Sequence, residues 1–420
     1  MKYGPSTHCR IFVVVFLSSV LSLALAGGRH ADDSQSNVKE RLPIPSGKYG
    51  VGRQGLELVD NAHGNAHSSI SAEHRASMVY IWYPAQPSSS KSFAEYFPHA
   101  TDINKEPKYK DAALGIFGES WPKIVDGSIH SHAVTDAQPL VGEQFPVVLF
   151  FPGYSSTTFS YTAQIENLVS NGYVVVAVEN TNDSGMVVFS DGRIELLESP
   201  PRLSSHPADP LQAMIASAQQ GTQTGAEQVR YILNVLKETT PLSRIMNLSM
   251  VGVAGHSAGG TFAARTCQID PRVKVCISED GGVNPVGAFF DYPDHNSMQQ
   301  PFLFIQIEHN PSDEELARMQ ESRAKWDKFL AHEQWQLRQC GKGSYFIQLH
   351  RPSMGHSSFS DGPVLDAREN EHTAVALENL RLTEELEKAF LDKYLKGVST
   401  SIFDRTDATP KGITIEPIDK

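Results

Sequence analysis

The chain has 420 residues, of which 40% are hydrophobic and 20% are charged, and its formal net charge at pH 7 is −12. This composition excludes a disordered chain and provides for a sizeable buried core in one large domain or two ordinary ones. The acidic balance argues against a nucleic-acid-binding surface.

The first 26 residues are typical of a secretory signal peptide. Lys2 and Arg10 precede an apolar run over 11–26, and Ala24-Leu25-Ala26 supplies the small residues that a signal peptidase requires. The run is short for a membrane span, which needs about 20 residues. We therefore expect a secreted, extracellular protein; the alternative is an uncleaved signal anchor.

Sequons and cysteines add to this picture. Asn182-Asp183-Ser184 and Asn247-Leu248-Ser249 are glycosylation candidates in an exported eukaryotic protein. Beyond Cys9 in the signal, Cys267, Cys276 and Cys340 permit at most one internal disulfide. We expect Cys267 and Cys276 to pack as small apolar groups, so that disulfides do not hold the fold.

Short apolar runs alternate with helical patterns along the chain. We expect strands over 56–59, 78–83, 146–151, 173–178, 249–254, 273–278, 302–307 and 344–349, the first as an antiparallel edge. We expect helices over 159–170, 211–237, 260–268, 312–330 and 372–396, with Gly221 and Gly225 interrupting the second. This order predicts an α/β fold: a mostly parallel, doubly wound sheet with helices on both faces.

The remaining segments define the expected domain organisation. Two irregular stretches, 93–145 and 180–210, are expected to be insertions that shape a pocket at the strand ends. We expect a polar N-terminal segment over 27–44, a single α/β domain over 45–399 and a loose polar tail over 400–420. No signal indicates an oligomeric state.

Gly255-His256-Ser257-Ala258-Gly259 lies between an expected strand and an expected helix. A sharp strand-to-helix turn lifts its central hydroxyl above the sheet, and small flanking residues let the chains pass closely. Ser257 is therefore the candidate nucleophile, and His256 is expected to serve packing.

A serine nucleophile needs a base that is oriented by an acid. Enzymes with this turn order the three as nucleophile, acid and histidine along the chain. His356, in the loop after the 344–349 strand, is the preferred base over His350. Asp280, after the 273–278 strand, is the preferred acid, and Glu308 and Asp313 are the alternatives.

An oxyanion site needs two backbone N–H donors. One comes from the residue after the nucleophile, Ala258, and the other from the loop after the 146–151 strand, at Tyr154.

Other motifs give weaker indications of a functional site. Gly50-Val51-Gly52-Arg53-Gln54-Gly55 precedes a strand rather than a helix, which argues against a dinucleotide site. The pairs His63/His67 and His130/His132 lie in polar loops without a metal-binding helix motif. We expect no cofactor and no metal.

With these residues placed, the chain resembles the secreted platelet-activating-factor acetylhydrolase family, the lipoprotein-associated phospholipases, among the α/β-hydrolases. The resemblance covers about 45–396 and rests on a set of short motifs: Gly47-Lys48-Tyr49-Gly50-Val51-Gly52, Ile81-Trp82-Tyr83-Pro84-Ala85, Phe151-Pro152-Gly153-Tyr154, Gly255-His256-Ser257-Ala258-Gly259-Gly260, Asp280-Gly281 and His356-Ser357-Ser358-Phe359-Ser360-Asp361. It implies an α/β-hydrolase fold, supports Asp280 as the acid, and implies a calcium-independent esterase for short or oxidised acyl chains at the second position of phospholipids.

We therefore expect a secreted serine ester hydrolase that acts on a small-molecule or lipid ester. The alternatives are a general carboxylesterase or polyesterase without phospholipid preference, and a non-catalytic binding protein on a hydrolase scaffold. Apolar residues over 112–121 are expected to pack over the pocket; the alternative is transient contact with a lipid surface.

Overall fold

The computed structural model describes residues 42–60, 75–86, 93–181, 183–197, 210–283, 298–308, 310–318, 322–351, 353–366, 371–404 and 409–418. Ten strands in this part of the chain form one sheet. They are β1 Gly50–Asp60, β2 Arg75–Ala85, β3 Val134–Thr135, β4 Phe145–Phe151, β5 Val174–Asn180, β8 Met246–His256, β9 Val273–Glu279, β10 Phe302–Ile307, β11 Ser344–Leu349 and β12 Ile413–Ile418. The expected signal peptide and Asn182 lie outside the described residues.

The sheet has the order β12-β11-β10-β9-β8-β4-β5-β2-β1-β3. Its central strands, from β5 through β11, pair in parallel, while β2 pairs antiparallel with both β1 and β5, and β12 pairs antiparallel with β11. The parallel strands are almost continuously apolar because both faces of the sheet are covered. A separate hairpin joins β6 Met186–Val188 to β7 Ile194–Leu196.

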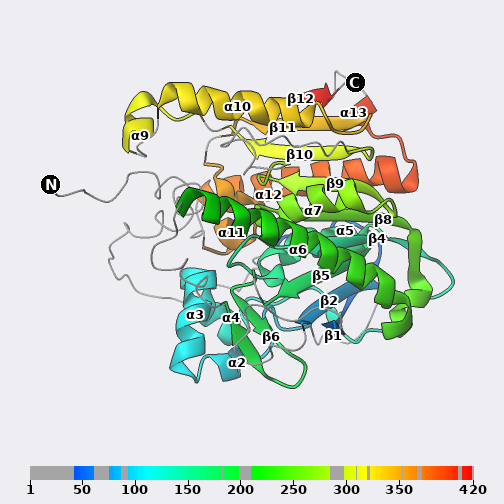
Figure 1. Cartoon of the computed structure of the whole chain (residues 1–420). Helices are drawn as coiled ribbons and strands as arrows, with labels where there is room; N and C mark the ends of the chain where they lie inside the picture. The colour runs from blue at the N-terminus through cyan, green and yellow to red at the C-terminus, as the bar shows by residue number, and fades with distance from the viewer. Residues whose placement is uncertain are drawn as a thin grey trace.

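Helices cover both faces of the sheet (Figure 1). One core layer includes α5 Thr162–Ser170 and α12 Glu371–Leu391, and the other includes α6 Pro210–Thr239, α7 Ala258–Ile269 and α10 Arg323–Leu337. The shorter elements are α2 Ala100–Ile103, α3 Pro107–Phe117, η2 Gly118–Ser120, α4 Trp121–Val125, η3 Thr158–Tyr161, η4 Pro241–Ile245, α9 Asp313–Arg318, η5 His356–Phe359, α11 Gly362–Asp366, the π-helix η6 Asp392–Lys396 and α13 Ser401–Asp404. The expected α/β architecture is confirmed.

Several sequence-based expectations need correction. The strand near residue 56 is not the edge, because β3 pairs on its outer side. The stretch 93–145 is not irregular throughout, since it contains α2, α3 and α4. Within 180–210, the hairpin β6–β7 replaces part of the expected loop.

Helix α6 is also continuous through Gly221 and Gly225. Glycine within a helix costs about 1 kcal/mol relative to alanine. Packing of Val229, Ile232 and Leu236 against the sheet outweighs that local preference.

The C-terminal tail is more ordered than expected. Helix α13 falls within it, and β12 pairs along the whole length of β11. Ile413 and Ile418 are buried, so the β-branched pattern of this segment outweighs its polar composition.

Cys267 and Cys276 form a disulfide, whereas we expected two packed thiols. The bond joins α7 to β9 across a sequence separation of 9 residues, and both side chains are buried. Cys340 is buried and lies 3.8 Å from the carbonyl oxygen of Gln336. The two partners of the disulfide lie on neighbouring elements, which sequence spacing does not reveal.

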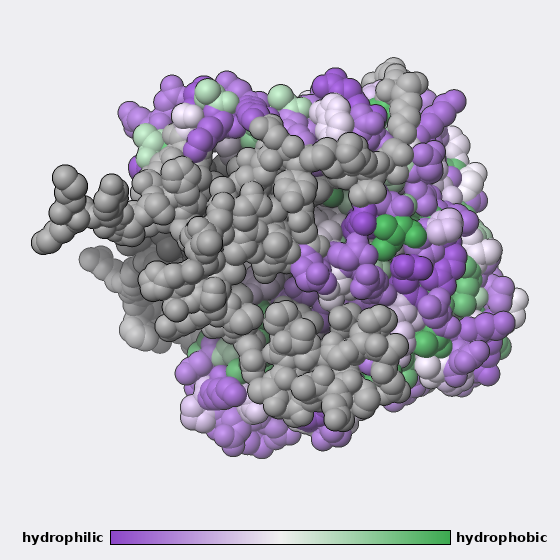
Figure 2. Space-filling model, in the orientation of Figure 1, coloured by the Kyte–Doolittle hydropathy of each residue, from purple (hydrophilic) through white to green (hydrophobic). Residues whose placement is uncertain are grey.

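The surface is largely polar. Figure 2 shows mostly hydrophilic residues with small separate hydrophobic spots on the coloured part of one face. In the described part of the chain, none of the helices is long and apolar enough to span a bilayer.

Candidate active site

Ser257 lies in a strained turn between β8 and α7. Its backbone has φ 55° and ψ −120°, outside the regions that L-residues usually adopt. A Cβ at Gly255 would lie 2.5 Å from the carbonyl carbon of Gly259, and one at Gly259 would overlap the Phe151 carbonyl. Glycine at both positions therefore permits the turn, as the motif predicts.

Asp280 follows β9 and is held by the neighbouring strand. Its N–H donates to the carbonyl of Ile305 at 2.7 Å, and its Oδ1 accepts from the N–H of Ile307 at 3.1 Å. Its Oδ2 lies 2.6 Å from Nδ1 of His356. The carboxylate is thus fixed by the backbone on one side and by the imidazole on the other.

His356 begins η5, in the loop after β11, and connects the other two side chains. Its Nε2 lies 2.9 Å from Oγ of Ser257. Because Nδ1–H donates to the carboxylate, Nε2 is left as the acceptor that faces the hydroxyl. The imidazole is 33% exposed, so a substrate has access to this relay.

The alternative acids, Glu308 and Asp313, and the alternative base, His350, contact other residues. Glu308 accepts from Nδ1 of His350 at 2.7 Å, and Nε2 of His350 lies 2.8 Å from Oγ1 of Thr414. Asp313 is 83% exposed and pairs with Arg323 at 2.9 Å. The structure brings neither alternative acid to His356.

The two expected oxyanion donors belong to segments that border Ser257. Ala258 is the first residue of α7, where a helix N–H has no intrahelical partner. Tyr154 follows Gly153, at which a Cβ would lie 3.4 Å from Cβ of Ser257. The loop after β4 therefore passes beside Ser257.

His256 does more than pack beneath the site. Its ring centroid lies 4.5 Å from that of His356, and its Nδ1 lies 2.8 Å from the hydroxyl of Tyr161. That hydroxyl also accepts from the N–H of Gly153 at 3.1 Å, so it connects His256 to the loop after β4. Burial lowers the pKa of His256 well below its usual value, which keeps this ring neutral. No sequence signal identified Tyr161.

Acidic side chains lie close to the relay. Glu279 and Glu387 are fully buried, and burial together with their mutual repulsion raises the pKa of Glu387 well above its usual value. Gln164 donates to Glu279 at 2.9 Å. Burial also raises the pKa of Glu333 to about 7. The charge of Asp280 adds to this rise, and the hydrogen bonds from Gln306 oppose it.

His130 and His132, one of the two histidine pairs with a spacing that a metal could use, contact other side chains. His130 stacks on Phe93, and His132 pairs with Glu166 at 3.0 Å, whereas His63 and His67 lie outside the described residues. Among the described residues, no group of three or more His, Cys, Asp and Glu side chains is arranged to hold a metal ion.

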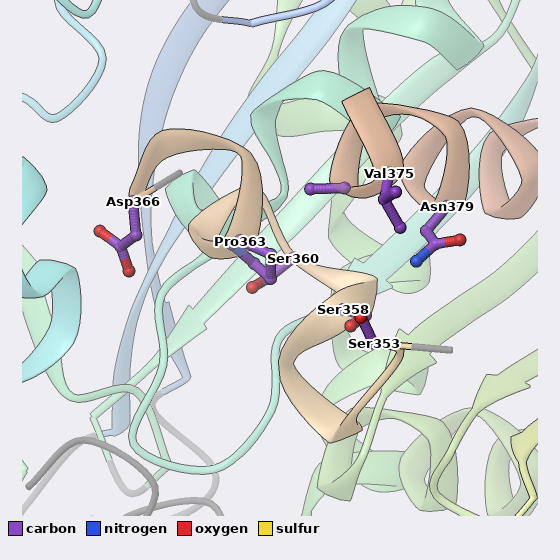
Figure 3. Close-up of a pocket in the computed structure, with 8 residues that line it drawn as sticks. Ser353, Ser358, Ser360, Pro363, Asp366, Val375 and Asn379 are labelled. Atoms are coloured by element: carbon purple, nitrogen blue, oxygen red, sulfur yellow. The ribbon is translucent and has the colours of Figure 1, made fainter. Parts of the chain in front are cut away.

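A cavity of about 290 Å³ lies beside η5 (Figure 3). It is lined by Ser353, Ser358, Ser360, Pro363, Asp366, Val375, Ala376 and Asn379. None of Ser257, Asp280 and His356 is among these residues, so this cavity is distinct from the relay.

Most of the apolar segment 112–121 is packed into the fold. Ala113, Phe117 and Trp121 are buried, and Ala112 and Ile116 pack against the same core layer. Leu114 is exposed. Most of this segment therefore belongs to the core of the fold.

The parallel sheet, the covering helices and the strand-to-helix turn at Ser257 define the α/β-hydrolase fold. A solved structure of a ferulic acid esterase from Streptomyces cinnamoneus has a TM-score of 0.65 and 25% sequence identity, and the match covers 90% of this chain and 99% of that one.

The family model of platelet-activating factor acetylhydrolase, isoform II, matches residues 34–203 and 210–396, so the chain belongs to that family. Two relatives are a platelet-activating factor acetylhydrolase of Cavia porcellus, 24% identical, and a probable 1-alkyl-2-acetylglycerophosphocholine esterase of Arthroderma benhamiae, 27% identical. The matches cover 64% and 58% of this chain, and 61% and 59% of those proteins.

Proposed function

We propose that this protein is a carboxylic ester hydrolase that uses Ser257 as nucleophile, His356 as base and Asp280 as the orienting acid. The observation that carries the proposal is the continuous chain of hydrogen-bond contacts from Asp280 through His356 to Ser257, at 2.6 Å and 2.9 Å. Membership of the family and the ester-hydrolase names of its relatives support it.

In this mechanism Nε2 of His356 accepts the proton of Ser257 as Oγ attacks the carbonyl carbon of the ester. The N–H groups of Ala258 and Tyr154 stabilise the oxyanion. The tetrahedral intermediate then expels the alcohol, which takes the proton from His356, and leaves an acyl-enzyme. Water then gives a proton to Nε2 of His356 and attacks the carbonyl carbon of the acyl-enzyme. As the bond to Oγ breaks, His356 returns that proton to Oγ, so that the carboxylic acid leaves and Ser257 is regenerated.

The proposed substrate is a phospholipid with a short or oxidised acyl chain at its second position. The relatives' names, which specify platelet-activating factor and 1-alkyl-2-acetylglycerophosphocholine, support this choice. The signal-like residues 1–26 support secretion, and the family match over most of 45–399 supports one catalytic domain.

A general carboxylesterase or polyesterase is the second candidate. The ferulic acid esterase aligns over 99% of its own length, which favours a site that accepts other esters. A non-catalytic binding protein is the third, and the intact hydrogen-bonded relay argues against it.

The test uses purified mature protein and its Ser257→Ala variant. We expect a fluorophosphonate probe to label the parent but not the variant, and the variant to keep less than about 1% of ester turnover. Turnover above that level in Ser257→Ala would remove the basis for the proposal. Absence of labelling in a folded parent protein would favour the binding protein.

A second measurement separates the two substrate classes. Rates on p-nitrophenyl esters of increasing chain length are compared with rates on a 2-acetyl phosphatidylcholine analogue. A phospholipase keeps its rate when the headgroup is present, whereas a general esterase loses it.

A further inference from the structure

The loop after β4 is connected to the turn after β5 through the carboxylate of Glu179. This side chain, near the end of β5, is only 1% exposed. Its Oε1 accepts from Oγ1 of Thr157 at 2.7 Å, and from the N–H and Oγ1 of Thr158 at 2.7 Å and 2.6 Å. Three donors from the β4 loop therefore converge on one oxygen.

Backbone hydrogen bonds connect the same two segments nearer the nucleophile. The N–H of Ser155 donates to the carbonyl of Asp183 at 2.7 Å, and the N–H of Gly185 donates to the carbonyl of Ser156 at 2.8 Å. A Cβ at Gly185 would overlap the carbonyl of Ser155, so glycine permits this close approach. Ser155 itself has φ 60°, a left-handed conformation that these contacts maintain.

A buried carboxyl group at this place is costly for folding. Burial raises the pKa of Glu179, and the hydrogen bonds from Thr157 and Thr158 oppose that shift. A buried polar side chain is tolerated when donors satisfy it. The donors of Thr157 and Thr158 belong to the segment that follows Tyr154, and Ser184, in the turn after β5, adds a further hydrogen bond. Tyr154 is thus held between Gly153, beside Ser257, and the residues bound by Glu179.

We propose that Glu179 is a positioning residue that fixes the β4 loop so that the N–H of Tyr154 points to the oxyanion. This inference rests on the proposed function. Its physical basis is that oxyanion donors accelerate the reaction only when they are aligned before the charge develops.

The test compares Glu179→Met, which removes the acceptor, with Glu179→Gln, whose amide oxygen can accept the same three donors. Removing an oxyanion donor typically lowers kcat about 100-fold or more, so we expect a loss of about 10- to 100-fold in kcat for Glu179→Met. We expect KM to stay within about 3-fold, since the loop acts on the transition state. Glu179→Gln should keep kcat within about 3-fold of the parent.

A boronic acid that mimics the tetrahedral intermediate provides a second readout. Its affinity should fall in Glu179→Met by about the same factor as kcat/KM. Glu166→Met is the matched control: Glu166 is equally buried, but it accepts from the N–H groups of His132 and Ala133, away from this loop. The control should lose stability and keep kcat.

The outcomes are distinguishable. If Glu179→Met keeps parental kcat and boronate affinity while Ser257→Ala is inactive, the positioning role is wrong and the proposed function stands. If Ser257→Ala is active, the proposed function itself is wrong. If Glu179→Met does not fold, the double variant Thr157→Val/Thr158→Val replaces it, and unchanged kinetics there would overturn the inference.

Discussion

Ser257 and Asp280 both have left-handed backbone angles, with φ of 55° and 52°. Such angles cost a non-glycine residue about 1 to 3 kcal/mol and persist only where the surroundings impose them. Here the N–H of Ser257 donates to the carbonyl of Glu279 at 2.8 Å, and that of Asp280 donates to Ile305. The end of β9 therefore fixes Ser257, and β10 fixes Asp280.

Replacing Asp280 by Asn should lower kcat by about 10⁴-fold, because the amide no longer holds the imidazole in the required tautomer. Glu308→Gln and Asp313→Asn should change kcat by less than about 3-fold, since Glu308 contacts His350 and Asp313 contacts Arg323. Steady-state kinetics on one ester substrate measures all three. A severe loss confined to Glu308→Gln or Asp313→Asn would identify a different acid.

Glu333→Gln should change how stability depends on pH. The folded protein raises the pKa of Glu333 from 4.5 to about 7, so the folded state holds the proton more tightly than the unfolded chain does. The stability from this group is complete below pH 4.5 and is lost as pH rises through about 7, by about 3 kcal/mol.

As the pH is raised from 5 to 8, the urea concentration at the unfolding midpoint should therefore fall less for Glu333→Gln than for the parent protein. The exposed Glu314→Gln is the control, and it should follow the parent curve. Parallel curves for the parent and Glu333→Gln would contradict the prediction.

Individual site residues differ in how well sequence predicts them. Ser257, Asp280 and His356 were chosen from strand-to-helix context and chain order, and the structure places them in contact. Tyr161 contacts His256, far along the chain, and Glu179 contacts Thr157 and Thr158 in the segment before β5. No local sequence pattern marks such contacts. Cys267 and Cys276 are only 9 residues apart, but their spacing does not reveal that α7 and β9 bring the two side chains together.

Helix α6 contains two glycines in different surroundings. A Cβ at Gly221 would meet no atom within 4 Å, whereas one at Gly225 would lie 2.6 Å from the ring of Phe262. Sequence propensity treats both as helix breakers, and neither breaks the helix. Packing of α6 against the sheet and α7 decides the outcome, and that packing is tertiary.

Gly221→Ala should raise the free energy of unfolding by about 0.5 to 1 kcal/mol, because alanine favours the helix. Gly225→Ala should lower it, because the methyl group must displace the Phe262 ring or the helix. Urea unfolding of the matched pair measures both changes. Equal effects of the two substitutions would show that helix propensity alone governs α6.

Strand β12 forms one edge of the sheet and pairs antiparallel with β11. Composition alone predicts a loose tail, because residues 400–420 are mostly polar. The parallel strands were more predictable: β10 and β11 match their expected bounds because each is an isolated apolar run. Edge strands bury one face only and give a weaker sequence signal.

A chain that ends at residue 408 should be less stable and should aggregate, because β11 would become an open edge with unpaired N–H and C=O groups. Light scattering during a thermal ramp, compared with a chain ending at Ile418, measures this effect. The same melting temperature and scattering for the two proteins would show that β12 contributes nothing to the sheet.

The Cys267–Cys276 bond joins α7, which starts directly after Ser257, to β9, which ends directly before Asp280. Closing a loop of this size stabilises a fold by about 2 to 3 kcal/mol in the chain-entropy model. Protein produced in a reducing bacterial cytosol would therefore carry two thiols here and denature at a lower temperature than protein from an oxidising secretory route. Choice of expression host alone would then alter the measured heat tolerance of one and the same sequence.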